Sequence, residues 1–219
     1  MNDVIEQISK RSRTEILKKV SEGYHPSSFC RVETQDPVEH IQMQEDLIEN
    51  MKLNMTNNKF VVHDIKESVL YETINSIIAA EQAHSLVYPQ DLGLELNNIH
   101  IEHKRCFDRA IEEIREEVFT TDLSIINVFA GVASHGVACV VSTDKQPRML
   151  SLVTPTCIML LKKEHVVKSL VDALHKVKST FDPLPTNVLF IAGPSRTSDV
   201  ELVTVFGVHG STQVHLVLY

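Results

Sequence analysis

The sequence predicts an α/β fold built on a largely parallel sheet, with helices at the N-terminal end. Beyond residue 58, short β-branched and apolar runs alternate with amphipathic helical segments, which is the order that βαβ units produce. Several runs are apolar at consecutive positions, as in VACVV (137–141) and VLFI (188–191), which is typical of strands buried on both faces. With 219 residues and 43% hydrophobic content, the chain can bury the core of one such domain.

The first part of the chain is expected to be helical. Apolar residues recur at helical spacing at positions 4, 5, 8, 16, 17 and 20. A second helix is predicted to start after Asp36, since Pro37 fits the first position of a helix, and to end at Asn57. We therefore expect an N-terminal helical extension over residues 1–57 and the α/β domain over residues 58–219.

The remaining elements follow from the spacing of apolar residues. Alternating or continuous β-branched runs predict strands at 59–63, 85–88, 99–102, 123–126, 137–142, 154–162, 187–193 and 214–219. Apolar residues three and four apart predict helices at 67–82, 110–118 and 164–177. Helices between successive strands favour parallel pairing, because parallel neighbours need a long crossover connection.

Composition excludes several classes of function. The net charge is −8 and no basic stripe carries interleaved aromatic residues, so a nucleic-acid partner is not expected. The four cysteines form no CxxC pair and the eleven histidines form no HExxH motif, so we expect no metal and no iron–sulfur cluster bound by this chain. The N-terminus lacks the apolar run of a signal peptide and no stretch reaches the length of a membrane span, which predicts a cytoplasmic protein.

Near the end of the chain, GPSRTSDVE (193–201) concentrates polar residues after a predicted strand. In open α/β sheets, ligands bind at the carboxyl ends of the strands, and this stretch begins there. One interpretation is an anion cradle made by the backbone N–H groups of the turn with Ser195, Arg196 and Thr197. The other is purely architectural: Ser198 and Glu201 form the capping box of a helix, with Asp199 at its positive end.

A second glycine turn follows, GVHG (207–210), and it holds His209 close to the backbone. That histidine either hydrogen-bonds locally or faces a ligand with a side chain that titrates near neutral pH. A triad of Ser195, Asp199 and His209 is not favoured, because no GxSxG pattern surrounds the serine. Below, the GPSRT loop is residues 193–197 and the GVHG loop is residues 207–210.

Taken together, GPSRTSDVELVTVFGVHG and the terminal β-branched strand resemble the C-terminal signature of the LUD (lactate utilisation domain) family. Upstream, SLVTPTCIMLL (151–161) and TDLSIINVFAGVASHGVACVV (121–141) resemble the preceding segments of the same family. The resemblance covers about residues 120–219. The resemblance adds a third stretch, ASHG (133–136), which is called the ASHG loop below. Its residues Ser134, His135 and Gly136 are expected to lie beside the other two loops.

The resemblance implies a three-layer, Rossmann-like fold of the NagB/RpiA/CoA-transferase type. It also implies a role in bacterial oxidation of L-lactate to pyruvate, together with two iron–sulfur partner proteins that carry the clusters. A small anionic ligand or a partner would then bind at Gly193, Ser195, Arg196, Thr197, Asp199, Glu201, His209 and Gly210, with Ser134, His135 and Gly136. The family does not settle whether this component is itself an enzyme. The alternative is a stand-alone CoA-transferase or folate cyclo-ligase-like enzyme acting on a phosphorylated or acyl substrate.

The chain departs from the family pattern within the ASHG loop and near it. Ser134 and His135 stand where the family usually has an acid and a threonine, and Val137 replaces a second threonine. Cys157 stands where histidine is common, and Ser211 replaces a proline. These changes remove one carboxylate and two hydroxyls, and leave His135 as either a substitute donor or a surface residue. A third hypothesis is therefore a partner-binding module whose loops are only architectural.

Overall fold

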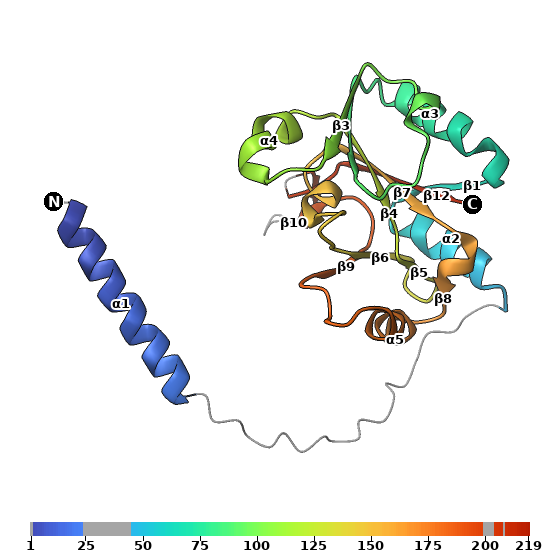
Figure 1. Cartoon of the computed structure of the whole chain (residues 1–219). Coiled ribbons are helices and arrows are strands. Elements are labelled where there is room, and N and C mark those ends of the chain that lie inside the picture. Colours follow the sequence, from blue (N-terminus) through green and yellow to red (C-terminus); the bar gives the residue numbers. More distant parts are fainter. Residues whose placement is uncertain (1, 24–44, 199–203, 208) are drawn as a thin grey trace. The chain divides into compact units, whose positions relative to one another are not determined.

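The computed structural model describes residues 2–23, 45–198, 204–207 and 209–219 (Figure 1). It divides into two compact units, Met1–His40 and Ile41–Tyr219. Within the first unit, α1 (Asn2–Gly23) is the helix that the sequence predicts, and its Ile16, Leu17 and Val20 side chains are exposed. No helix in the described ranges combines the length and apolarity needed to cross a membrane.

The second unit is built on a six-stranded sheet in which every pairing is parallel, as predicted. In spatial order its strands are β1 (Val61–Asp64), β12 (Gln213–Leu218), β7 (Thr156–Leu161), β4 (Leu123–Asn127), β2 (Ser85–Pro89) and β3 (His103–Phe107). The last strand of the chain therefore lies between β1 and β7. The six side chains of β7 and five of the six in β12 are buried, which explains the continuous apolar run in β7 and the mostly apolar sequence of β12, in which His215 is a buried polar exception.

One face of this sheet is covered by α3 (Leu70–Ala80). The helix buries Leu70, Ile74, Ile77 and Ile78, the four positions that its sequence spacing places on one side. They pack in one cluster with strand residues that include Ile125, Ile158 and Val217.

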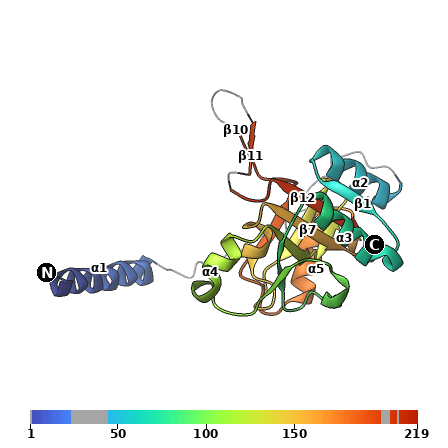
Figure 2. The same ribbon diagram turned by 90° about the horizontal axis from the view of Figure 1, so that it is seen from above.

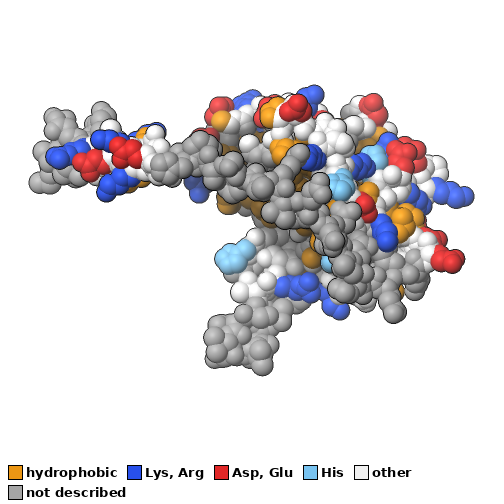
Figure 3. All heavy atoms as spheres, turned by 90° about the horizontal axis from the view of Figure 1, so that it is seen from below, with side chains coloured by type: hydrophobic (Ala, Val, Ile, Leu, Met, Phe, Trp, Pro, Cys, Tyr) orange, Lys and Arg blue, Asp and Glu red, His pale blue; other side chains and the backbone are white. Residues whose placement is uncertain are grey.

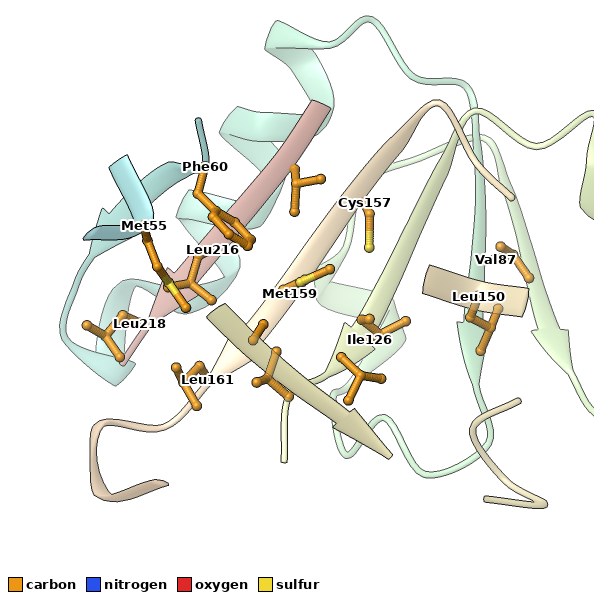
Figure 4. Close-up of a cluster of buried hydrophobic side chains, with 14 of the residues drawn as sticks. Met55, Phe60, Val87, Ile126, Leu150, Cys157, Met159, Leu161, Leu216 and Leu218 are labelled. Atoms are coloured by element: carbon orange, nitrogen blue, oxygen red, sulfur yellow. The ribbon is translucent and has the colours of Figure 1, made fainter. Parts of the chain in front are cut away.

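The opposite face packs against α2 (Leu47–Asn57) and α4 (Ile111–Phe119). Figure 4 shows Met55 and Phe60 against Leu216 and Leu218, with Met159 further into the same cluster. Residues assigned above to an N-terminal extension thus contribute to this core. The Asp46 carboxylate caps α2 by accepting from two backbone N–H groups, so this helix begins at Leu47 and does not extend back to residue 45.

A second, mixed sheet also lies on that face. Its order is β8 (Val166–Val167), β5 (Ala130–Val132), β6 (Val137–Val141) and β9 (Val188–Ile191), and the β5–β6 and β6–β9 pairs are antiparallel. α5 (Leu170–Thr180) covers its outer side with Ala173 and Val177. Figure 1 shows this order of layers: α3, the parallel sheet, the second sheet and α5. The fold is therefore mixed α/β around a parallel sheet, and the strands predicted at 137–142 and 187–193 belong to a second sheet and not to the parallel one.

The remaining elements are short. Within the described ranges, single turns of 3-10 helix occur at Glu67–Val69, Leu96–Asn98, Arg148–Ser151 and Lys163–His165. β10 (Arg196–Ser198) and β11 (Thr204–Phe206) pair antiparallel as a ribbon that stands out from the body in Figure 2.

Three sequence expectations are wrong. Residues 99–102 form no strand, since the strand lies at 103–107 and Ile99 instead inserts into the core beneath α3. The helix expected from residue 164 begins at Leu170, because Ser169 and Asp172 form its capping box. Ser198 lies in β10 and so does not cap a helix, while Asp199 and Glu201 lie outside the described residues.

Candidate functional site

The GPSRT loop follows β9 and crosses the C-terminal end of α2. Gly193 has φ +89°, and a Cβ at this position would collide with the backbone oxygen of Asn58. Gly136, in the ASHG loop, has φ +59°, and a Cβ there would collide with the backbone of Asn54 and Met55. Both loops therefore need glycine for the same reason: they pass directly against the end of α2.

Asn58 and Asn54 fasten the ASHG loop to that helix. The Asn58 side-chain amide donates to the backbone oxygens of His135 at 2.8 Å and Gly136 at 2.9 Å, and the Asn54 amide donates to that of Ala133 at 2.8 Å. Asn58 thus touches both loops, and the structure brings the ASHG and GPSRT loops together.

The GPSRT loop is joined in turn to the GVHG loop through Ser195. Its N–H donates to the backbone oxygen of Ser211 at 2.9 Å, and its carbonyl accepts from the N–H of Gly207 at 3.0 Å. Its hydroxyl oxygen accepts from the backbone N–H of His209 at 3.3 Å, and Gly210 packs against its Cβ. The three stretches predicted to lie beside one another form one connected structure, here called the loop junction.

The junction sits at the amino ends of the parallel strands. The Ser211 hydroxyl donates to the Thr154 oxygen at 2.7 Å, and the Thr212 N–H donates to the Pro155 oxygen at 2.8 Å. Those residues precede β12 and β7, whereas β9, which leads into the GPSRT loop, belongs to the second sheet. The expected site at the carboxyl ends of the parallel strands is therefore wrong, because the strand before the GPSRT loop is not part of that sheet.

Within the junction, two backbone N–H groups that an anion could otherwise use are already engaged. The N–H groups of Ser195 and Gly207 donate to protein carbonyls. The side chains of Arg196, Thr197 and His209, by contrast, are exposed, and Arg196 donates to the Ala192 oxygen at 3.2 Å. Any ligand or partner at this point would meet these three side chains. The Ser195 hydroxyl pairs with the backbone N–H of His209 and not with its ring, so the two form no catalytic pair.

The departures from the family pattern have structural roles. Ser134 is buried and its hydroxyl lies 2.7 Å from Nδ1 of His135, whose side chain is exposed. Ser211 is buried and uses its hydroxyl to hold the junction to the loop before β7, which a proline could not do. Cys157 lies inside the core, where burial raises the pKa of its thiol to about 12.

Charge is distributed without a single-sign patch on the face seen in Figure 3, where Lys and Arg alternate with Asp and Glu over the described part of the chain. Within the described ranges, no three His, Cys, Asp or Glu side chains gather in a group that could hold a metal ion.

Cys139 is a second buried cysteine besides Cys157. Burial raises the pKa of its thiol to about 11, so this thiol stays protonated near neutral pH.

Comparison with known proteins identifies the family. The model of the LUD domain matches residues 48–219. The chain belongs to the LUD domain family. That match begins within α2, the helix on which the ASHG and GPSRT loops rest.

Relatives of this LUD protein include two uncharacterized bacterial proteins. One from Neisseria meningitidis is 33% identical over 106 residues, 48% of this chain and 46% of its own length. YkgG of Escherichia coli is 32% identical over 92 residues, 40% of each chain. These matches span less than half the length of either relative. Lactate utilization protein C 1 of Bacillus mycoides is 28% identical over 182 residues, 76% of each chain.

A solved structure of a DUF162 family protein from Deinococcus radiodurans superposes with a TM-score of 0.59. It covers 78% of this chain and 95% of that protein at 12% identity, which supports the fold alone.

The LUD protein also holds residues that the sequence reasoning did not single out. Asn58 joins two loops, although by sequence it only follows the predicted end of a helix at Asn57. His63 and His215 both stand in β-branched strands, and they meet in a cavity described below because β1 and β12 are neighbours. Each segment is predicted as a strand from its own residues, but those residues do not show that the two strands pair.

Proposed function

We propose that this LUD protein is a component of an L-lactate oxidation system, acting with iron–sulfur partner proteins that carry the electron-transferring clusters. The observation that carries the proposal is membership of the LUD family, together with a relative named lactate utilization protein C 1 that aligns over 76% of each chain. A role in lactate utilisation is the coarse part of this conclusion, and the partners and the reaction step are the finer part. A cytoplasmic location and a NagB/RpiA/CoA-transferase type of fold belong to the same proposal.

The contact region in this proposal is the loop junction. Ser195 and Asn58 fix the backbone, and Arg196, Thr197 and His209 present exposed polar side chains on it. An exposed guanidinium is suited to a carboxylate, either on a small anion such as lactate or on a partner surface. No step of bond making is assigned to these residues.

The test is a reconstitution. The iron–sulfur proteins proposed as partners are produced with and without this chain, and L-lactate-dependent reduction of an artificial electron acceptor is measured. We expect reduction to fall strongly when the chain is left out and to return when the purified protein is added. Equal rates with and without it would contradict the proposal.

The alternative, a stand-alone enzyme on a phosphorylated or acyl substrate, has less support. A phosphate cradle needs free backbone N–H groups, and those of Ser195 and Gly207 already donate to protein carbonyls. Thermal unfolding in the presence of CoA, folates, nucleotides and sugar phosphates distinguishes the two: a clear stabilisation by one of these would favour the enzyme.

A further inference from the structure

A cavity separate from the loop junction lies between β1 and α3. Its volume is about 750 Å³, and its walls mix apolar side chains with His63, His215, Asp64, Glu72, Thr73 and Ser76. The lining includes two carboxylates but no lysine or arginine. A small anion is therefore disfavoured here, whereas an uncharged molecule can use both the apolar wall and the polar groups.

Three titratable side chains form a chain of hydrogen bonds at this cavity. Nε2 of His63 lies 3.1 Å from Nδ1 of His215, and Nε2 of His215 lies 3.1 Å from Oε1 of Glu81. The two imidazole rings are stacked with centroids 5.4 Å apart. Glu81 is the C-cap residue directly after α3, and its carboxylate also accepts from the Thr156 hydroxyl at 3.4 Å. Parallel pairing of β1 with β12 sets Val61 opposite His215, which places His63 on the same face two residues on.

These contacts fix the direction of the hydrogen bonds. A carboxylate can only accept, so His215 donates to Glu81 through Nε2–H. Its Nδ1 is then an acceptor, and His63 must donate to it through Nε2–H. In the neutral imidazole of His63, Nδ1 is left with a lone pair.

That nitrogen is accessible. Among the described residues no hydrogen bond to Nδ1 of His63 is found, and the atom is not one of the fully buried polar atoms without a partner. His63 is half-buried and its ring lines the cavity. A proton-accepting atom thus belongs to a residue that lines a partly apolar cavity, and a chain of hydrogen bonds holds that residue from behind.

We propose that this cavity binds a small uncharged molecule bearing a hydroxyl group, which donates its proton to Nδ1 of His63 in a hydrogen bond while its apolar part lies against β1 and α3. His215 and Glu81 are positioning residues that hold His63 in the tautomer able to accept. The site is independent of the lactate proposal, since it lies on a different face and needs no partner protein.

Other charges near His63 do not change this assignment. Asp64, on the same strand, is held by Lys52 at 2.8 Å and by Lys163 at 2.7 Å, and Glu72 reaches the cavity from α3. Burial lowers the pKa of His63, as does the nearby His215, and burial lowers the pKa of His215 as well. Both rings are therefore neutral at pH 7.5, and His63 gains a proton only below its ordinary value of 6.5.

The experiment uses the full chain and three probes that share one cyclohexane ring and differ only in their polar group: cyclohexanol, its methyl ether, and cyclohexanecarboxylate. Binding is followed by NMR through the methyl signals of Val61, Ile65 and Ile77, which line the cavity. We expect cyclohexanol to bind about three- to tenfold more tightly than the ether, as one hydrogen bond provides, and the carboxylate to bind more weakly than both. Equal affinity for alcohol and ether, or preference for the carboxylate, would overturn the proposal.

Two further measurements use the unaltered protein and therefore do not depend on whether a variant folds. Nitrogen-15 NMR should show an unprotonated Nδ1 on His63, and the opposite tautomer would overturn the assignment. Alcohol binding should weaken only below pH 6.5, since protonation removes the acceptor, and binding that strengthens on acidification would contradict it. His63→Phe should abolish the preference for the alcohol over the ether, whereas His100→Phe, at an exposed histidine outside this cavity, should leave it intact.

Discussion

Gly193→Ala is the sharpest test of how the GPSRT loop is held. At φ +89° a side chain crowds its own backbone, which costs about 1–2 kcal/mol. The new Cβ would also collide with the backbone oxygen of Asn58, and the shift needed to relieve a packed collision costs about 1–3 kcal/mol. We therefore expect the free energy of unfolding to fall by about 2–5 kcal/mol in total.

Gly93→Ala is the matched control. Gly93 has φ +72°, but an added Cβ there meets no atom within 4 Å. Only the cost of placing a side chain at a positive φ angle applies here, so the free energy of unfolding should fall by about 1–2 kcal/mol. Urea denaturation of both variants, followed by circular dichroism, measures the two losses, and their difference isolates the contact with Asn58. Equal losses would refute the reasoning that the GPSRT loop is pinned on the end of α2.

Three other predictions address the junction and the edge of the sheet. Asn58→Ala leaves two carbonyl groups of the ASHG loop without their donor, so the free energy of unfolding measured with urea should fall by about 1–3 kcal/mol. The control Asn57→Ala, at an exposed neighbouring residue, should lower it by less than about 0.5 kcal/mol. Arg196→Ala should change the melting temperature by no more than about 2 °C relative to the unaltered protein, because the Arg196 side chain is exposed. It should nevertheless lower the rate of L-lactate oxidation in the reconstituted system. An unchanged rate would favour a purely architectural role for the GPSRT loop. Hydrogen bonds from Lys163 and Lys52 lower the pKa of Asp64, so its contribution to stability, about 0.2–1 kcal/mol for a partly exposed pair, is present at pH 7 and lost as the pH falls below 3.8. Asp64→Asn should therefore be less stable than the parent at pH 7, and the gap should close in acid; a gap that persists at pH 2 would contradict the ion-pair explanation.

The sequence by itself determined most of the local structure. The four buried positions of α3 follow from apolar residues three and four apart, β7 follows from a run that is apolar at consecutive positions, and β12 follows from its β-branched and apolar residues around His215. It also determined the family, because the GPSRT and GVHG stretches lie in the order and spacing of the LUD pattern. Local rules failed where two patterns competed, as at Ser198, where a capping-box spacing occurs in a segment that pairs as a strand.

Only the tertiary structure decided which strands are neighbours. The sequence of a strand indicates whether its two faces are buried, but it does not indicate which strand pairs with it. The reason is that one apolar strand can pair with and pack beside any other apolar strand. The sequence therefore could not place β9 in a second sheet, which moved the GPSRT loop to the amino ends of the parallel strands. Nor could it bring His63, 152 residues before His215, to within 3.1 Å of it. The cavity that these two histidines line exists because the last strand of the chain inserts beside the first strand of the sheet.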